Sequence, residues 1–183
     1  MLINKIHMDF VYQIDNLLTP DECQKYMNMF KEKDLIENID DNHRKYYRIQ
    51  FDDKEIADKL YQKIKHHLSK KIKKIAAGMN EHIRLSMYDP KQFFGIHKDG
   101  INFDKNNKNR MSYATLNIFL NDDFEGGSTT FYEKDKSTVK FVCKPKMGSG
   151  AFFYSQQFHE GNKIISGQKF LLRTDLMVNH QSC

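Results

Sequence analysis

The sequence has little proline, little glycine and no long apolar run. Only 3 of its 183 residues are proline and 9 are glycine, which excludes collagen-like chains and most low-complexity disordered chains. The longest uninterrupted apolar run is Ala151–Tyr154, far shorter than the roughly 20 residues of a membrane-spanning helix. The first residues lack the apolar segment of a secretory signal. We therefore expect neither a membrane span nor export by a signal peptide.

Cysteine is also scarce. The three cysteines are Cys23, Cys143 and Cys183, an odd number with no Cys-x-x-Cys spacing, so neither a disulfide framework nor a cysteine zinc site is predicted. This pattern is typical of a reducing compartment, and we expect the protein to be cytoplasmic.

Length and composition predict one globular domain. Hydrophobic residues make up 39% of the chain and charged residues 29%, and no internal repeat or low-complexity linker divides it. A chain of this length buries roughly 70% of its unfolded surface, so a metal is not needed merely to fold it. We predict a single domain over residues 1–183, with a helical N-terminal layer over 1–80 and a strand-rich core over 81–183.

Two helices are predicted before residue 80. Residues 19–22, Thr-Pro-Asp-Glu, form a capping box with proline at the first helical position, and the helix should run from about Pro20 to Lys33. Apolar residues at helical spacing indicate a second, longer helix that Gly78 should end. Its buried stripe would consist of Ile56, Leu60, Ile64, Leu68, Ile72 and Ile75.

Basic residues concentrate on this second helix. The chain carries a net charge of +5, and residues 62–74 contain lysines but no acid. These lysines are Lys63, Lys65, Lys70, Lys71, Lys73 and Lys74. Such a run indicates either a nucleic-acid surface or a solvated face opposite the buried stripe, and charge runs usually belong to the second class.

From residue 81 the apolar period changes to two. Ile83, Leu85 and Met87 alternate with polar residues, so one face of this strand is apolar and the other can line a cavity. Shorter strands are predicted at about 93–98, 112–120, 128–132, 138–143, 150–154 and 169–178. Helices followed by many short strands indicate an α+β fold, a sandwich or barrel with helices packed on one sheet.

His97-Lys98-Asp99 stands at the end of a predicted strand. Residues two apart on a strand project to the same side, so His97 and Asp99 can bind one metal ion while Lys98 points away. Such a pair is common by chance, and a third ligand is needed. His159, which follows the predicted strand 150–154, is the candidate. Two imidazoles and one carboxylate on one face of an octahedral ion suit Fe(II), because three adjacent positions stay open.

The open positions on such an ion can take a keto acid and dioxygen. 2-Oxoglutarate chelates through its carboxylate and keto oxygen, and its far carboxylate then needs a cation. Lys169 and Arg173 both follow His159 on the last predicted strand, four residues apart and therefore on the same face. Either can serve, although Arg173 could instead pair with Asp175. Thr115 and Asn117 share a strand face with Phe119 and are expected to line the same cavity.

Several segments occur in an informative order along most of the chain. They are residues 10–23, Tyr88 upstream of His97, residues 120–131, residues 159–161 and residues 167–169. Each segment alone is a weak signal. Together they resemble the 2-oxoglutarate and Fe(II)-dependent dioxygenases, in particular the prolyl 4-hydroxylase-like branch.

The resemblance implies a double-stranded β-helix, or jelly-roll, fold with His97, Asp99 and His159 as iron ligands. It implies Fe(II) as the metal, 2-oxoglutarate and dioxygen as cosubstrates, and ascorbate as a reductant. It matches Lys169 to the residue that binds the C5 carboxylate of 2-oxoglutarate, and Tyr88 to a tyrosine that contacts this cosubstrate. Lys169 is therefore the favoured one of the two candidate cations.

The activity implied is hydroxylation of an unactivated C–H bond, with a peptidyl residue such as proline as the substrate. A small molecule and a nucleic-acid base stay open as substrates. The basic balance suggests the base, whereas the lack of a second spaced arginine after His159 disfavours it. A non-enzymatic jelly-roll binding module is the rival of another class. Such a module would have no reason to carry this ordered set of ligands.

Overall fold

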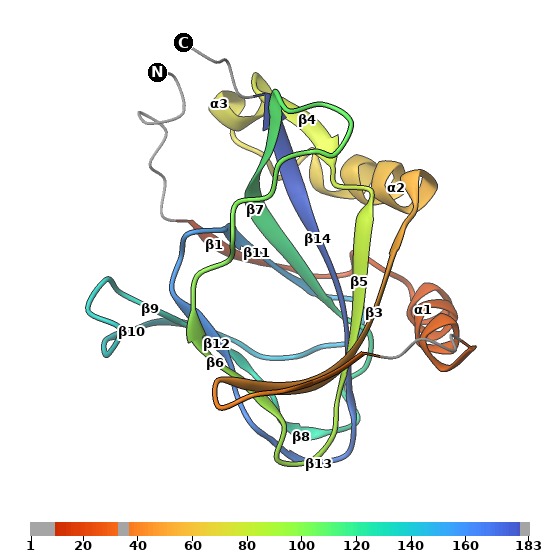
Figure 1. Ribbon diagram of the computed structural model, residues 1–183, viewed down its shortest axis with the longest axis vertical. Helices are drawn as coiled ribbons and strands as arrows, with labels where there is room; N and C mark the ends of the chain where they lie inside the picture. The colour runs from red at the N-terminus through yellow and green to blue at the C-terminus, as the bar shows by residue number, and fades with distance from the viewer. Residues whose placement is uncertain (1–9, 33–36, 180–183) are drawn as a thin grey trace.

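A computed structural model describes residues 10–32 and 37–179 of the chain (Figure 1). The helices are α1 (Pro20–Glu32), α2 (Lys54–Ile64) and α3 (Lys70–Lys73). The strands of the first half are β1 (Val11–Ile14), β2 (Glu37–Asp40), β3 (Arg44–Asp52), β4 (Ala76–Met79), β5 (His82–Tyr88) and β6 (Phe93–His97). Those of the second half are β7 (Arg110–Phe119), β8 (Glu125–Gly126), β9 (Thr129–Tyr132), β10 (Val139–Cys143), β11 (Gly150–Tyr154), β12 (His159–Gly161), β13 (Ile164–Ser166) and β14 (Lys169–Asn179).

Most of these strands form one antiparallel sheet that folds over on itself. Its order is β1-β11-β7-β14-β5-β3-β6-β12-β9-β10, with β2 added to β3 and β4 added to β14, while β8 and β13 pair separately. Figure 1 shows β7, β14 and β5 running lengthwise, with β6, β12 and β9 beside their lower half and α1 and α2 on the opposite side. The folded sheet encloses an interior that is lined by the inward-facing residues of both halves.

Alternation along β14 separates the helix-facing core from this interior. Phe170, Leu172 and Leu176 belong to the main apolar core, together with residues of α1 and α2. Lys169 and Arg173, which have the opposite parity, line a cavity inside the folded sheet. Since neighbouring residues of a strand point to opposite faces, one strand supplies both the packing that fixes its position and the polar groups of the interior.

The first predicted helix and the predicted strands of the second half are confirmed. α1 begins at Pro20 with the expected capping box, because Thr19 Oγ1 accepts from the N–H of Glu22 and a Glu22 carboxylate oxygen accepts from the N–H of Thr19. Lys33, the predicted last residue, lies outside the described part of the chain. The predicted strand over 169–178 corresponds to β14.

The single long helix predicted up to Gly78 is wrong. α2 ends at Ile64, and a new short helix, α3, begins after Ser69, whose side chain accepts from the N–H of Ile72. Gly78, with φ of +101°, lies in β4 and not at a helix end. The apolar stripe is nevertheless buried, since Leu68 and Ile72 join the core. The apolar periodicity therefore predicted correctly which side chains are buried. It did not predict that the helix stops, because the cap at Ser69 and the pairing of β4 with β14 interrupt it.

The predicted division of the chain at residue 80 also needs correction, because the first part is not a purely helical layer. β1 pairs with β11, and β3 pairs with both β5 and β6, so these strands belong to the same sheet as the later ones. β3 was not predicted, because its buried residues, Tyr46 and Ile49, are three apart in the sequence. That spacing does not show the alternation of buried and exposed residues that is typical of a strand. None of the helices in the described ranges has the length and apolar character of a bilayer span.

Gly148 occupies a position where the fold requires glycine. Its N–H donates to the carbonyl of Phe119 at the end of β7, and its carbonyl accepts from the N–H of Leu18 before α1. Its φ is +74°, and a Cβ atom there would lie 2.2 Å from the Leu18 carbonyl oxygen. We predict that Gly148→Ala lowers the free energy of unfolding by about 1–3 kcal/mol through backbone strain alone, with the clash adding to this, as measured by urea unfolding.

Gly100→Ala is the matched control, because a Cβ atom at Gly100 would meet nothing within 4 Å. Its free energy of unfolding should stay within about 0.5 kcal/mol of the unaltered protein. Equal stability of the two variants would show that the conformation of Gly148 is not required.

Candidate active site

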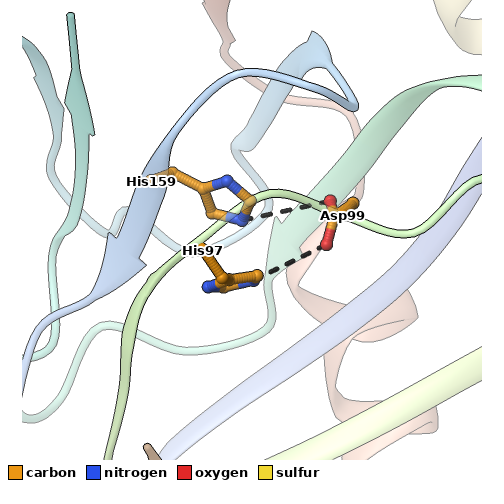
Figure 2. A group of neighbouring side chains, drawn as sticks. All are labelled: His97, Asp99 and His159. Carbon is orange, nitrogen blue, oxygen red and sulfur yellow. Dashed lines mark ion pairs between the residues drawn. The ribbon is translucent and has the colours of Figure 1, made fainter. Parts of the chain in front are cut away.

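The sheet brings the three predicted metal ligands together. His97 is the last residue of β6 and His159 is the first of β12, and these strands pair antiparallel with His159 directly opposite His97. Asp99 follows two residues after His97, and its N–H donates to the carbonyl of Ser155. Figure 2 shows both imidazoles turned toward the carboxylate of Asp99.

The ligand atoms lie close enough for one ion to contact all three. His97 Nε2 is 3.6 Å from Asp99 Oδ1, and His159 Nε2 is 3.9 Å from Asp99 Oδ2. The three groups together offer one ligand atom each, all within 4.8 Å of one another. Asp99 and His159 are buried, while His97 is half-buried.

Backbone carbonyls fix which imidazole nitrogen faces the metal position. Nδ1 of His97 lies 2.8 Å from the carbonyl oxygen of Gly95, and Nδ1 of His159 lies 2.9 Å from that of Gln157. Because a carbonyl oxygen can only accept, we assign the proton of each ring to Nδ1, which leaves the lone pair of Nε2 free for a metal. Burial lowers the pKa of His159 to about 4, so this ring is a neutral ligand at ordinary pH.

Asp99 is held as an ionised carboxylate. Burial alone would raise the pKa of this carboxyl group. The Arg173 guanidinium, with NH2 2.9 Å from Oδ1, acts together with His159, His97 and Thr115 to offset that effect and lower the pKa. The hydroxyl of Thr115 donates to Oδ2 at 2.5 Å. Two neutral imidazoles and one carboxylate form the donor set typical of non-haem Fe(II), and they leave three adjacent octahedral positions for other ligands. These residues therefore fit the iron that the sequence predicts.

Lys169 is a buried cation whose anionic partner is missing from the described part of the chain. Its side chain is 3% exposed, and Nζ donates to the carbonyl of Gly127 at 2.6 Å. The ammonium also lies 5.5 Å from the ring centroid of Tyr88 and 5.2 Å from that of Phe119. Burial lowers the pKa of Lys169 to about 8. A buried ammonium of this kind fits the far carboxylate of a bound dicarboxylic acid.

Arg173, the alternative cation, is already engaged with acids. Besides its contact with Asp99, its NH2 lies 3.5 Å from Asp175 Oδ1. Within residues 10–32 and 37–179, its Nε has no hydrogen-bond partner, and the same holds for Oδ1 of Asn117 nearby. The pairing of Arg173 with Asp175 that the sequence suggested is present, but the shorter contact is with the metal ligand Asp99.

The remaining predicted residues take two different positions. Tyr88 and Asn117 line the same cavity as His97, His159 and Lys169. Tyr88 is buried, and burial raises the pKa of its hydroxyl. Thr115 instead supports the metal ligand Asp99 through its hydroxyl.

Two arginines of this cavity were missed at the sequence level. Arg48 projects from β3 and Arg84 from β5, and both line the cavity. Arg84 has the same parity as Ser86 and Tyr88 on the polar face of its strand, so a signal for it was present. Arg48 offered none, because β3 itself was not predicted.

Comparison with known families decides the assignment. The sequence model described as the 2OG-Fe(II) oxygenase superfamily matches residues 83–174, half of the chain, and the match includes all three ligands. The chain belongs to the 2OG-Fe(II) oxygenase superfamily. Fe(II) is accordingly the metal of its His97, Asp99 and His159 site, and 2-oxoglutarate is its cosubstrate. A search of curated protein sequences finds no match.

Solved structures similar to this oxygenase include several prolyl hydroxylases. The viral collagen prolyl hydroxylase of Paramecium bursaria Chlorella virus-1, in its 2OG complex, is 25% identical with a TM-score of 0.69, covering 92% of this chain and 96% of that one. A Pseudomonas putida prolyl-4-hydroxylase is 14% identical with a TM-score of 0.70, and each chain is covered to 100%. A Trichoplax adhaerens prolyl hydroxylase is 14% identical with a TM-score of 0.66, covering 96% and 87%. The predicted jelly-roll fold is confirmed.

We predict that Thr115→Val weakens Fe(II) binding by the oxygenase on the order of tenfold. The substitution keeps the shape of the side chain but leaves Asp99 Oδ2 without the hydroxyl that orients it, and loss of such outer contacts typically costs 10–100-fold in metal affinity. Anaerobic equilibrium dialysis with Fe(II) measures the effect.

Thr174→Val is the matched control. Thr174 is equally buried, but its hydroxyl donates to the carbonyl of Asn80 and does not contact a ligand. Equal Fe(II) affinities of the two variants would mean that Thr115 has no role in positioning Asp99.

Proposed function

We propose that this oxygenase hydroxylates an unactivated C–H bond of a peptidyl residue, namely proline. The observation that carries the proposal is the convergence of His97, Asp99 and His159 in a cavity that also holds the buried ammonium of Lys169. The similar structures support a peptide substrate, because several of them are prolyl hydroxylases and one holds a hypoxia inducible factor peptide fragment.

Each residue of the site would have a distinct role in this reaction. When bound, Fe(II) with 2-oxoglutarate and dioxygen supplies the oxidising chemistry, and 2-oxoglutarate leaves as succinate and carbon dioxide. His97, Asp99 and His159 bind the metal. Lys169 anchors the C5 carboxylate of 2-oxoglutarate, while the rings of Tyr88 and Phe119 beside it exclude water and strengthen that ion pair.

Lys169 is the better anchor because, unlike Arg173, it contacts no acidic side chain among the residues that the structure describes. Arg173 already contacts Asp99 and Asp175, and removing it from Asp99 would leave a buried carboxylate with fewer partners. We assign Arg173 to positioning of Asp99.

The other substrates considered from the sequence have less support. The basic run of lysines lies on α2 and α3, at the upper end of the molecule in Figure 1, whereas β6 and β12 carry the histidines lower down. That separation disfavours a nucleic-acid base. A small molecule is an outcome that the assay below would detect. Ascorbate as a reductant and a cytoplasmic location belong to the same proposal.

We predict that Lys169→Gln lowers the affinity for 2-oxoglutarate on the order of 100-fold while Fe(II) affinity stays within about twofold. The variant removes the charge that faces the C5 carboxylate and leaves the metal ligands intact. Anaerobic titration of the Fe(II) protein with 2-oxoglutarate, followed through the weak visible absorption of the chelate, gives the affinity.

Arg173→Gln provides the comparison, because it should weaken Fe(II) binding through Asp99 more than it weakens 2-oxoglutarate binding. The pH dependence gives a second check. Since the pKa of Lys169 is about 8 in the free protein, 2-oxoglutarate affinity should fall as pH rises through 8, and Lys169→Arg should remove that dependence. If Arg173→Gln lost 2-oxoglutarate binding selectively while Lys169→Gln kept it, then Arg173 and not Lys169 would be the residue that binds the C5 carboxylate.

The reaction itself is tested with proline-containing peptides in the presence of Fe(II), 2-oxoglutarate and oxygen. We expect succinate release and a mass gain of one oxygen atom on proline, located by tandem mass spectrometry. His97→Ala, which lacks a metal ligand, should release no succinate. Succinate release that responds to metabolites or nucleic acids, and to none of the peptides, would refute the peptidyl substrate.

A further inference from the structure

The cavity beside the metal ligands carries an excess of positive charge. Four cationic side chains line it: Arg48, Arg84, Lys169 and Arg173. Its lining residues in the described part of the chain include no aspartate or glutamate. Of the acids that contact these cations, Asp99 is a metal ligand, Asp175 is buried and Glu37 is partly exposed.

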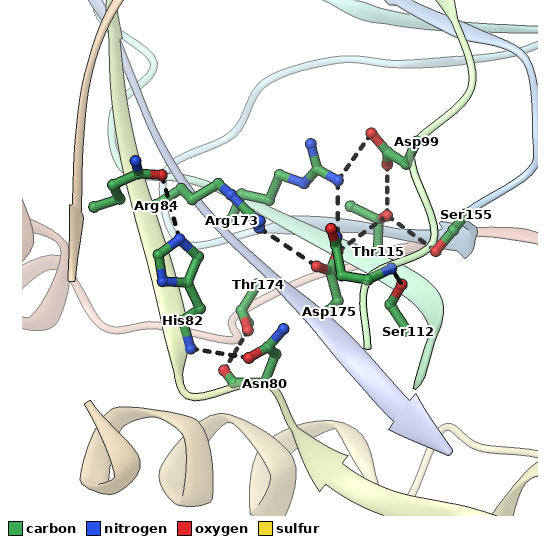
Figure 3. Close-up of polar contacts among 12 residues, drawn as sticks. Asn80, His82, Arg84, Asp99, Ser112, Thr115, Ser155, Arg173, Thr174 and Asp175 are labelled. Carbon is green, nitrogen blue, oxygen red and sulfur yellow. Dashed lines mark hydrogen bonds and ion pairs between the residues drawn. The ribbon is translucent and has the colours of Figure 1, made fainter. Parts of the chain in front are cut away.

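Among the described residues, three carboxylates contact these four cations. Asp99 pairs with Arg173. Asp175 lies between the two other guanidinium contacts, 3.5 Å from NH2 of Arg173 and 3.4 Å from NH1 of Arg84. Figure 3 shows both guanidinium groups converging on Asp175. Arg48 pairs with Glu37, whose side chain is 41% exposed and therefore screened by solvent. One positive charge remains unbalanced.

Loading the site does not remove this excess. Fe(II) brings two positive charges, and 2-oxoglutarate brings two carboxylates, one for the metal and one for Lys169. The sum is unchanged, and the uncompensated cation then lies on the arginine side of the cavity. A single additional carboxylate would neutralise it, whereas a doubly charged phosphate would exceed it.

Arg84 is the group best placed to meet such a carboxylate. Its side chain is 16% exposed, and its contact with Asp175, the one acidic contact it makes in the described ranges, is long for a hydrogen bond. It also lines a second cavity of about 250 Å³, bounded by residues 102–106 of the loop after Asp99. Arg84 therefore stands between the metal site and this outer cavity.

Apart from Arg84, the charged residues that line the outer cavity are three acids, Asp52, Glu81 and Asp104, and two cations, Lys105 and Arg110. Lys105 contacts Asp52 and Arg110 contacts Asp104, so the excess of positive charge belongs to the inner cavity and to Arg84 at its edge. A guanidinium presents paired donors that match both oxygens of a carboxylate.

We infer that the substrate of this oxygenase carries a carboxylate, which Arg84 binds with support from Arg48. This inference rests on the proposed function, because it concerns the substrate that lies beside the iron and 2-oxoglutarate. The carboxylate has two sources in a peptide, the C-terminus and an acidic side chain, and both present the same chemistry to Arg84.

The test measures binding of matched peptides to protein loaded with Mn(II) and N-oxalylglycine, an inert analogue of 2-oxoglutarate, by isothermal titration calorimetry. One pair is acetyl-prolyl-alanine as the free acid and as the amide. The other is acetyl-prolyl-glutamate amide and acetyl-prolyl-glutamine amide. We expect the acid of at least one pair to bind about tenfold more tightly than its neutral partner, and the responding pair identifies the source.

Variants assign this preference to its residue. Arg84→Gln should abolish it, Arg84→Lys should keep part of it, and Lys105→Gln, which removes a 75% exposed cation from the outer cavity, should leave it unchanged. If Arg84→Gln does not fold, Arg48→Gln should reduce the preference, because its acidic partner Glu37 is largely solvated.

Two results would overturn the inference: neither acid binds more tightly than its neutral partner, or the preference persists in Arg84→Gln and Arg48→Gln. Failure of the proposed function is distinguishable from both. In that case the loaded protein would bind none of the four peptides, acid or neutral, and would not hydroxylate proline, whereas failure of the inference alone would leave peptide binding and proline hydroxylation intact.

Discussion

The antiparallel pairing of β6 with β12 places His159 directly opposite His97, and the site depends on this register. A shift of one residue would turn one imidazole to the other face of the sheet. The register is held on both sides, because β12 also pairs with β9 and β6 also pairs with β3. The N–H of Asp99 in turn donates to the carbonyl of Ser155, the residue after β11. The metal site is thus a consequence of how the sheet closes.

The interior that this closure creates contains buried cationic groups that lower the free energy of unfolding when no anion is bound. An ordinary lysine has a pKa near 10.5, and that of Lys169 is lowered to about 8. Between these values the unfolded chain binds the proton and the folded chain does not, so Lys169 costs stability below pH 8 and that cost disappears as pH rises toward 10.5. A bound carboxylate would reverse the penalty. Arg84 is in a similar position, because burial also lowers its pKa. Arg173 differs, because Asp99 and Asp175 outweigh its burial and raise its pKa. The unfavourable burial of Lys169 and Arg84 suits a site that binds anions and not one that only stabilises the fold.

Much of this arrangement could be predicted from sequence because it follows local rules. The capping box of α1 and the alternation in β5 and β14 depend on neighbours in the chain. The spacing of His97 and Asp99 is likewise local. His159 was the candidate third ligand because it follows the predicted strand 150–154, and the family resemblance supported it. The prediction of one long helix was wrong because the cap at Ser69 and the pairing of β4 with β14 interrupt it. β3 was not predicted because its buried residues Tyr46 and Ile49 are three apart. The contact of Arg173 with Asp99 and the role of Arg84 depend on strands distant in sequence, which no pattern along one strand reveals.

A crystal structure of the protein with Mn(II) and N-oxalylglycine tests the central claim most directly. The account predicts one ion bound by Nε2 of His97, Nε2 of His159 and the carboxylate of Asp99, with the far carboxylate of the analogue on Nζ of Lys169. An ion bound elsewhere, or an analogue whose far carboxylate lies on Arg173 while Lys169 stays unpaired, would contradict it.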